Sequence, residues 1–188
     1  LVVSASLPSA ARAAGDPVTN TLDPTKVSSW LELHADGTII ARSGKTETGT
    51  SATAFYAQMI AEELDVDPAK ITMVVGHTDE TPDGGFSAGF LGGANNVKKV
   101  AAYTRQALVG LASERLGTPA ANLTVKNGVV SGGGKSVSYV DLVKGHTLDL
   151  KIPVTGRMAR VDLKDPVGIA DLMGIMVTGN PPTKPIGQ

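Results

Sequence analysis

The chain has 188 residues, of which 41% are hydrophobic and only 4% aromatic, so its core must consist mainly of Val, Leu, Ile, Ala and Met. The 17 basic and 18 acidic residues give a net charge of -1, which excludes the basic field typical of nucleic-acid-binding proteins. The absence of cysteine excludes disulfides, iron–sulfur ligation and thiol catalysis within this chain. No apolar run approaches the roughly 20 residues that a membrane span requires.

Residues 1–15 resemble the end of an export signal. A short apolar region precedes small residues, and Ala11-Arg12-Ala13 is an A-x-A-like cleavage site; the alternative is an Ala-rich N-terminal arm. Residues 16–156 carry the regular patterns and predict one α+β domain. Residues 157–188 are rich in proline and glycine, which is typical of an extended linker to a further domain.

The first half of the domain predicts two strands, a helix and a third strand. Residues 30–34 and 38–41 form a hairpin around Asp36-Gly37. A helix over residues 51–64 is capped by Thr50 or Ser51 and ends before Pro68. Its apolar side chains recur at spacings of three and four and predict one buried face: Ala52, Phe55, Tyr56, Met59, Ile60 and Leu64. The β-branched run at residues 71–75 predicts a buried strand.

The second half begins with a long glycine-rich loop over residues 76–93. A helix then spans residues 95–116, with an inner side made by Val97, Val100, Ala101, Tyr103 or Thr104, Leu108, Leu111 and Ala112. Residues 123–126 and 129–131 form a second hairpin around Asn127-Gly128, and Ser138 with Asp141 resembles the capping box of a short helix. The elements together predict an α+β fold with a mixed sheet of hairpins and two main helices packed on one side.

Two glycine- and hydroxyl-rich turns are the candidate functional elements. Residues 43–51 connect a strand to a helix, and residues 84–93, five of which are glycine, also lead into a helix. Such turns present backbone N–H groups and a helix N-terminus, which suit an anion such as phosphate. Ordinary tight turns are the alternative interpretation.

Other chemistries find less support. Gly44-Lys45-Thr46 resembles a P-loop, but that motif needs a glycine where Ile39 stands. Glu47 paired with Asp65, Asp79 or Asp83 would make an acid–base pair, although solvated surface carboxylates are the common case. The three histidines lie far apart in sequence, which argues against a histidine metal site: His34, His77 and His146.

A resemblance to a known family links these elements. Residues 47–67, 71–76 and 79–89 and the helix that follows resemble the large subunit of the molybdenum hydroxylases, the family of xanthine dehydrogenase, aldehyde oxidase and isoquinoline or nicotinate dehydrogenase. Residues 123–130 and 148–151 continue the similarity in the family's order, so that it covers about residues 28–166. The sequence is most similar to the exported bacterial branch, which implies a periplasmic protein exported by a twin-arginine signal.

The resemblance implies a molybdopterin cofactor, usually in its cytosine dinucleotide form. The family's Glu-Met-Gly-Gln-Gly turn falls on residues 47–51, with Thr50 at the glutamine and Ser51 at the second glycine. A later serine-containing loop falls on residues 87–93, where Phe90 and Gly92 occupy the serine positions. The implied cofactor contacts are Thr48, Gly49, Thr50, Ser51, Ser87, Ala88, Gly89, Phe90 and Gly92.

The reaction implied is hydroxylation of an aldehyde or an electron-poor N-heterocycle, with water as the oxygen source. The family's catalytic glutamate has no match here, so this chain contributes no catalytic residue. The implied partners are the remainder of the large subunit, a small subunit with [2Fe–2S] clusters and a cytochrome c acceptor. The alternatives are a non-catalytic structural or assembly segment of such a complex and an unrelated secreted binding module.

Overall fold

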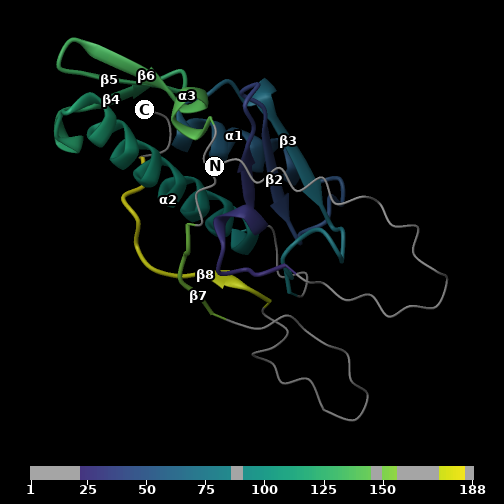
Figure 1. Cartoon of the computed structure of the whole chain (residues 1–188). Coiled ribbons are helices and arrows are strands. Elements are labelled where there is room, and N and C mark those ends of the chain that lie inside the picture. Colours follow the sequence, from purple (N-terminus) through teal and green to yellow (C-terminus); the bar gives the residue numbers. More distant parts are fainter. Residues whose placement is uncertain (1–21, 86–90, 145–149, 156–173, 185–188) are drawn as a thin grey trace.

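The computed structural model describes residues 22–85, 91–144, 150–155 and 174–184 (Figure 1). Two helices, α1 (Ala52–Leu64) and α2 (Leu91–Leu116), pack against each other and against strands of a three-stranded sheet. The predicted α+β class is confirmed. The longest helix begins four residues earlier than the predicted Asn95. No helix of the described residues is both long and apolar enough to span a bilayer.

The first sheet sets the direction of the candidate turns. β1 (Leu31–Leu33) and β2 (Ile39–Ser43) form the predicted antiparallel hairpin, and β3 (Ile71–Val75) runs parallel to β2 after the crossover through α1. Ser43 and Val75 are register partners, and the Gly76 N–H donates to the Ser43 carbonyl oxygen at 3.1 Å. The segments that leave β2 and β3 therefore start side by side at the carboxyl edge of the sheet.

The second sheet is an antiparallel meander of β4 (Thr124–Lys126), β5 (Val129–Gly132) and β6 (Lys135–Ser138). The Asn127-Gly128 turn has positive φ at both residues, as a type I′ hairpin requires. The sequence did not predict β6, which follows a second glycine turn. Ser138 caps α3 (Tyr139–Val143), because its Oγ accepts the Asp141 N–H at 3.0 Å, so the predicted cap is confirmed.

Helix α2 packs against both the second sheet and a third one (Figure 1). It contacts β5 and β6, and it contacts β8 (Met176–Val177), which pairs with β7 (Val154–Thr155). The buried Asn96 side chain holds this pair, since Nδ2 donates to the Ile175 carbonyl at 2.8 Å and Oδ1 accepts the Val177 N–H at 2.9 Å. Short 3-10 turns complete the fold at Val27–Ser29, Pro68–Lys70 and Ala120–Asn122.

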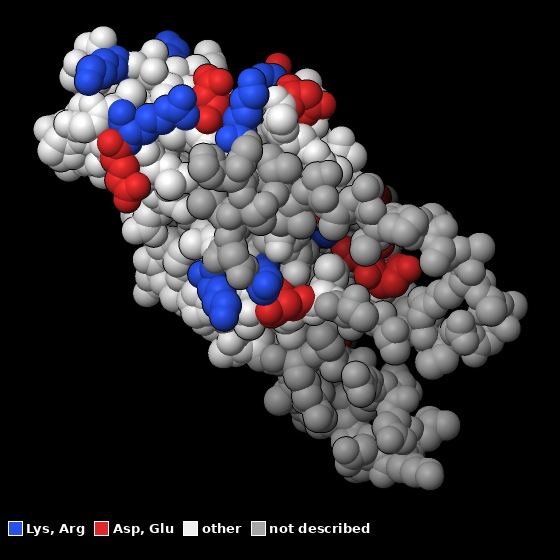
Figure 2. Space-filling view, viewed as in Figure 1, with Lys and Arg blue, Asp and Glu red and all other residues white. Residues whose placement is uncertain are grey.

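The core lies between the first sheet and the two main helices. Its buried members include Trp30, Leu31, Ile39, Tyr56, Ile60, Leu64, Val97, Val100, Leu108 and Ala112. Two burial predictions were wrong. Phe55 is 39% exposed, because the buried stripe of α1 is centred on positions 52, 56, 60 and 64. Strand β3 is only partly buried, because it lies at the edge of its sheet and exposes Thr72. The face in Figure 2 carries interspersed basic and acidic side chains, in keeping with the small net charge.

Candidate cofactor site

The two predicted turns meet at a pair of glycines. A Cβ placed on Gly44 would overlap the Pro82 carbonyl oxygen and the Gly84 nitrogen. A Cβ on Gly84 would lie 2.6 Å from the Gly44 carbonyl carbon, closer than side chains approach backbone. The turn after β2 and the loop after β3 therefore cross in direct backbone contact, which glycine alone permits here.

A third glycine joins the second loop to both helices. Gly92 and Gly93 lie in the first turn of α2. A Cβ on Gly93 would clash with the Tyr56 hydroxyl and lie 2.9 Å from Cγ of Lys45, so the start of α2 sits on α1 and on the first turn. Burial lowers the pKa of Lys45, and the charge of Asp83 opposes that shift. The predicted contacts Ser87, Ala88, Gly89 and Phe90 lie outside the described residues.

The amino end of α1 is capped by Glu47. Its Oε1 accepts the N–H groups of Thr50 (2.8 Å) and Ser51 (3.0 Å), and its Oε2 accepts the N–H of Thr53 (3.0 Å). These bonds, that from Thr53 foremost, lower the pKa of the Glu47 carboxyl group. Ser51 occupies the N-cap position but its side chain makes no capping bond, so the predicted Thr50 or Ser51 cap is corrected to Glu47.

The backbone of the turn has the shape that glycines favour. Gly49 has φ of 84° and Ser51 has φ of 59°, both in the left-handed region. These are the two positions on which the glycines of the family's turn fall. A Cβ on Gly49 would meet no atom of the described residues within 4 Å, so that part of the chain leaves the outer side of the turn open. Residues Thr48, Thr50 and Ser51 are all exposed around it.

The resemblance implies a pterin dinucleotide, and the turn suits such a ligand on one side only. The exposed hydroxyl groups and the open face of Gly49 suit hydrogen bonding to a polar ligand that lies over the turn. A phosphate seated on the amino end of α1 does not fit, because the Glu47 carboxylate already accepts the N–H groups that would bind it. The turn therefore offers a polar ligand its outer side, and not the helix N-terminus.

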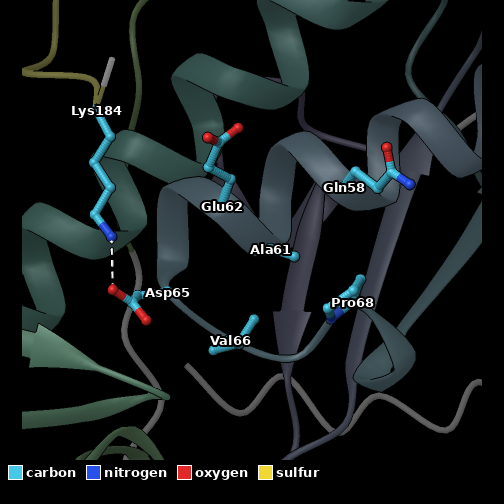
Figure 3. A pocket seen from close by; sticks show the side chains of 7 residues that line it. All are labelled: Gln58, Ala61, Glu62, Asp65, Val66, Pro68 and Lys184. Atoms are coloured by element: carbon cyan, nitrogen blue, oxygen red, sulfur yellow. Dashed lines mark hydrogen bonds and ion pairs between the residues drawn. The ribbon is translucent and has the colours of Figure 1, made fainter. Parts of the chain in front are cut away.

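The proposed carboxylate pair of Glu47 and Asp65 is excluded by distance along the helix. Glu47 caps the first turn of α1, whereas Asp65 is its C-cap residue. The 13-residue helix that separates them places the two groups about 20 Å apart. Asp65 instead accepts the Asn127 N–H at 3.0 Å and pairs with Lys184 at 2.9 Å. It lines a groove of about 390 Å³ with Gln58, Ala61, Glu62, Val66, Pro68 and Lys184 (Figure 3).

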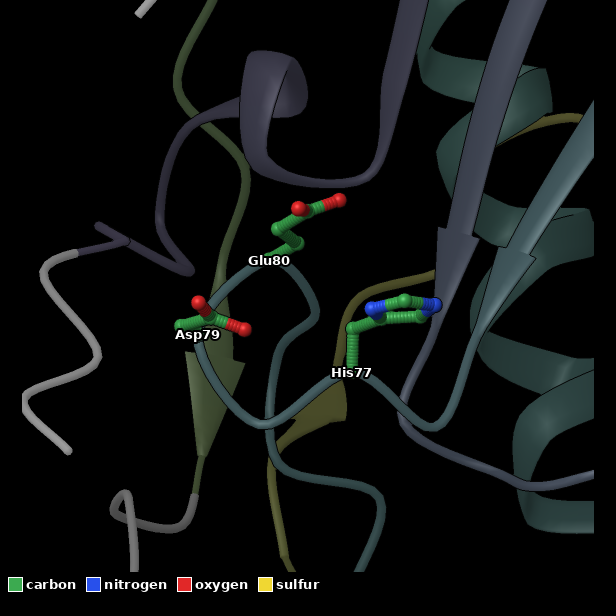
Figure 4. A group of neighbouring side chains, drawn as sticks. All are labelled: His77, Asp79 and Glu80. Carbon is green, nitrogen blue, oxygen red and sulfur yellow. The ribbon is translucent and has the colours of Figure 1, made fainter. Parts of the chain in front are cut away.

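The loop after β3 contains a cluster that sequence reasoning missed. His77, Asp79 and Glu80 bring one ligand atom each to within 4.8 Å of one another, and all three are exposed (Figure 4). The wide separation of the three histidines argued against a metal site, whereas the His-x-Asp-Glu spacing within one turn was the available signal.

Comparison with known proteins identifies the family of this chain. The sequence model of the molybdopterin cofactor-binding domain family matches residues 8–166. The chain belongs to this family. The domain is 33% identical over 139 residues to a subunit of nicotinate dehydrogenase from Pseudomonas putida, an overlap of 72% of this chain and 12% of that protein. It is 31% identical to the membrane-bound aldehyde dehydrogenase [pyrroloquinoline-quinone] of Gluconacetobacter polyoxogenes, over 72% of this chain and 18% of that one.

Solved structures of two other proteins share the fold of this domain. The domain superposes on Cu,Mo-CO dehydrogenase with a TM-score of 0.50 and 26% identity, over 60% of this chain and 15% of that one. Quinoline 2-oxidoreductase from Pseudomonas putida 86 shares the fold with a TM-score of 0.52 and 20% identity, over 60% of this chain and 15% of that one. The resemblance to the molybdenum hydroxylases is confirmed. The domain spans less than a fifth of the length of these proteins.

Proposed function

We propose that the domain forms the amino-terminal part of the cofactor-binding subunit of a molybdenum hydroxylase-type oxidoreductase. One observation carries this proposal: Gly49 and Ser51 keep left-handed backbone at both glycine positions of the family's cofactor turn. A serine in that conformation is strained, so its presence there means that the shape of the turn is maintained by its surroundings. The turn opens outward, where a cofactor held mainly by other parts of the enzyme can lie over it.

In this proposal the domain binds and orients the cofactor. Thr48, Thr50 and Ser51 direct hydroxyl donors and acceptors to it, and Gly49 permits a close approach of the backbone. The cofactor, which we propose is molybdopterin cytosine dinucleotide, supplies the two-electron oxidation when it is bound. The substrate is an aldehyde or an N-heterocycle, and water is the source of the oxygen atom that enters the product.

Electron transfer requires partners, because a chain without cysteine has no thiolate to ligate an iron–sulfur cluster. We propose a small subunit with [2Fe–2S] clusters and a cytochrome c as a further acceptor. The export-signal pattern of residues 1–15 supports a periplasmic location.

Metal and pterin analysis of the complete purified enzyme tests the proposal. We expect stoichiometric molybdenum, a pterin and a cytidine nucleotide after acid release. An enzyme that contains neither molybdenum nor pterin would refute the proposal.

A matched pair of glycine substitutions tests the site itself. Gly49→Leu places a bulky side chain on the open face of the turn and should abolish molybdenum retention. Gly134→Leu is the control, because Gly134 also has positive φ (74°) and open space around it, but lies in the hairpin between β5 and β6. Both changes carry a similar backbone penalty of about 1–2 kcal/mol, so only the loss of cofactor should differ. Full molybdenum content in Gly49→Leu would favour a second candidate function, that of a non-catalytic assembly segment. The replacement of the family's glutamine by Thr50 also favours this second candidate.

A further inference from the structure

Glu47 is an exposed residue whose carboxylate is nevertheless fully engaged by backbone. It accepts three N–H groups from the turn and the first residues of α1, at 2.8–3.0 Å. The first N–H groups of a helix have no partner within the helix, and the helix dipole makes their surroundings attractive to an anion. Here a side chain from the same turn takes the place of that anion.

We propose that Glu47 is a positioning residue for the cofactor turn. Its carboxylate clamps residues 48–51 onto the start of α1, and it excludes the cofactor's phosphate groups from the helix N-terminus. The cofactor then meets the hydroxyl groups and the open face of Gly49, and the phosphates are bound elsewhere in the enzyme. The clamp stands on the geometry alone, whereas its consequence for the cofactor rests on the proposed function.

The surroundings of the turn explain why a clamp is needed. At its base, the Thr46 side chain packs on Gly76, where a Cβ would clash with it. At its tip, a Cβ on Gly49 would contact nothing within 4 Å, so packing among the described residues does not hold that point. Ser51 must also be kept in left-handed backbone, which is unfavourable for a residue with a Cβ. The bonds from Thr50 and Ser51 to Glu47 fix the turn at this point.

The charge of Glu47 explains why the cofactor's phosphate groups are excluded from the amino end of α1. The Glu47 carboxylate is negative and lies at the amino end of α1, where its oxygens face the N–H groups of the first turn. Burial raises the pKa of the Tyr56 hydroxyl on α1, and the charge of Glu47 adds to that effect. A phosphate brought to the same N–H groups would be repelled by this carboxylate and would find no free donor at Thr50, Ser51 or Thr53.

Hydrogen–deuterium exchange of the complete enzyme tests the clamp. In Glu47→Ala we expect the amides of Thr50, Ser51 and Thr53 to exchange about tenfold faster than in the parent enzyme, with a smaller increase in Glu47→Gln, which keeps one acceptor oxygen. Glu114→Gln makes the same chemical change at an exposed position of α2 and should leave these rates unchanged. Equal exchange in the parent enzyme and in Glu47→Ala would overturn the clamp. The Gln variant provides the same test if the Ala variant does not fold.

Cofactor content and cofactor removal test the second part. We expect the molybdenum content to fall in Glu47→Ala, and the three amides to be equally protected in the parent enzyme with and without cofactor. Protection of these amides by the cofactor in Glu47→Gln, or full molybdenum retention in Glu47→Ala, would overturn it. Absence of molybdenum from the parent enzyme would instead refute the proposed function and leave the exchange test of the clamp intact.

Discussion

Replacing Glu63 by glutamine should destabilise the domain more than any other single charge removal on α1. Glu63 is 1% exposed, yet its carboxyl group is paired with Arg105, and it lies near the carboxyl end of the helix. Its Oε1 accepts the Nε–H of Arg105 from α2 (3.1 Å) and forms an ion pair with Nη2 of the same residue (2.9 Å). Its Oε2 accepts the backbone N–H of Lys184 (2.8 Å). Arg105 also donates to the Pro182 carbonyl at 2.6 Å. The carboxylate thus joins both main helices to the segment around residue 184.

The size of the effect follows from the acceptors that are lost. In Glu63→Gln one oxygen remains, so an N–H group of the new amide must face a donor of either Arg105 or Lys184. Breaking a buried ion pair costs about 3–5 kcal/mol, and leaving a buried donor unsatisfied costs about 1–3 kcal/mol. Arg105 is 21% exposed and can be partly solvated, which reduces the loss to about 2–3 kcal/mol.

Urea unfolding of the domain, followed by circular dichroism, measures this loss. A decrease of that size corresponds to a fall in Tm of about 4–12 °C for a chain of this length. Glu114→Gln on the exposed side of α2 is the control and should change the unfolding free energy by less than about 0.5 kcal/mol. The double variant Glu63→Leu, Arg105→Met should lose less than the sum of its single changes, because no buried charge is left alone. A Glu63→Gln domain as stable as its parent would refute the reasoning.

Three further predictions use the same unfolding measurement. Tyr139→Phe should leave stability unchanged or raise it by up to about 1 kcal/mol, because the hydroxyl is buried without a hydrogen-bond partner among the described residues; a large loss would show that it has one. Ser51→Gly should stabilise by about 0.5–1 kcal/mol by relieving left-handed strain, and a loss would contradict the strain. Hydrogen bonds from Thr38 lower the pKa of Asp36, so the stability that this carboxylate contributes is present above its unfolded pKa of about 3.9 and is lost as pH falls through the lower folded value. Asp36→Asn should remove that part of the acid sensitivity, and an unchanged pH profile would argue against it.

The elements that the sequence predicted well are those determined by residues that are close together in the sequence. The three- and four-residue periodicity of α2 identified its buried side, including Val97, Val100, Leu108 and Ala112. Asn127-Gly128 and the Ser138 cap are equally local, since each signal lies within four residues of the structure that it determines. Local chemistry of this kind is independent of what packs around it, so a single sequence is enough to predict it.

The errors arise where burial depends on distant parts of the chain. Phe55 fits the apolar spacing of α1, but the helix presents positions 52, 56 and 60 to the core and leaves Phe55 at the border of the stripe. The β-branched run of β3 indicates a strand covered on both faces, whereas β3 is an edge strand in this chain. The buried Glu63 lies 42 residues from Arg105 and 121 from Lys184, so no local pattern could reveal its partners.

At the candidate site, five residues combine features that local sequence predicts with features that only the folded structure reveals. The family resemblance predicts a cofactor turn at residues 47–51, and this stays a prediction. The backbone there is left-handed at both Gly49 and Ser51, although Ser51 is not glycine. A helix N-terminus with small residues suggested an anion site. Whether its N–H groups are free, however, depends on the position of one nearby carboxylate. Glu47 precedes the helix by five residues, outside the ordinary capping positions, and its three bonds change the inferred binding surface from the end of α1 to the outer side of the turn. The sequence therefore predicts the turn, whereas the geometry of Glu47 shows which N–H groups of the turn are already engaged.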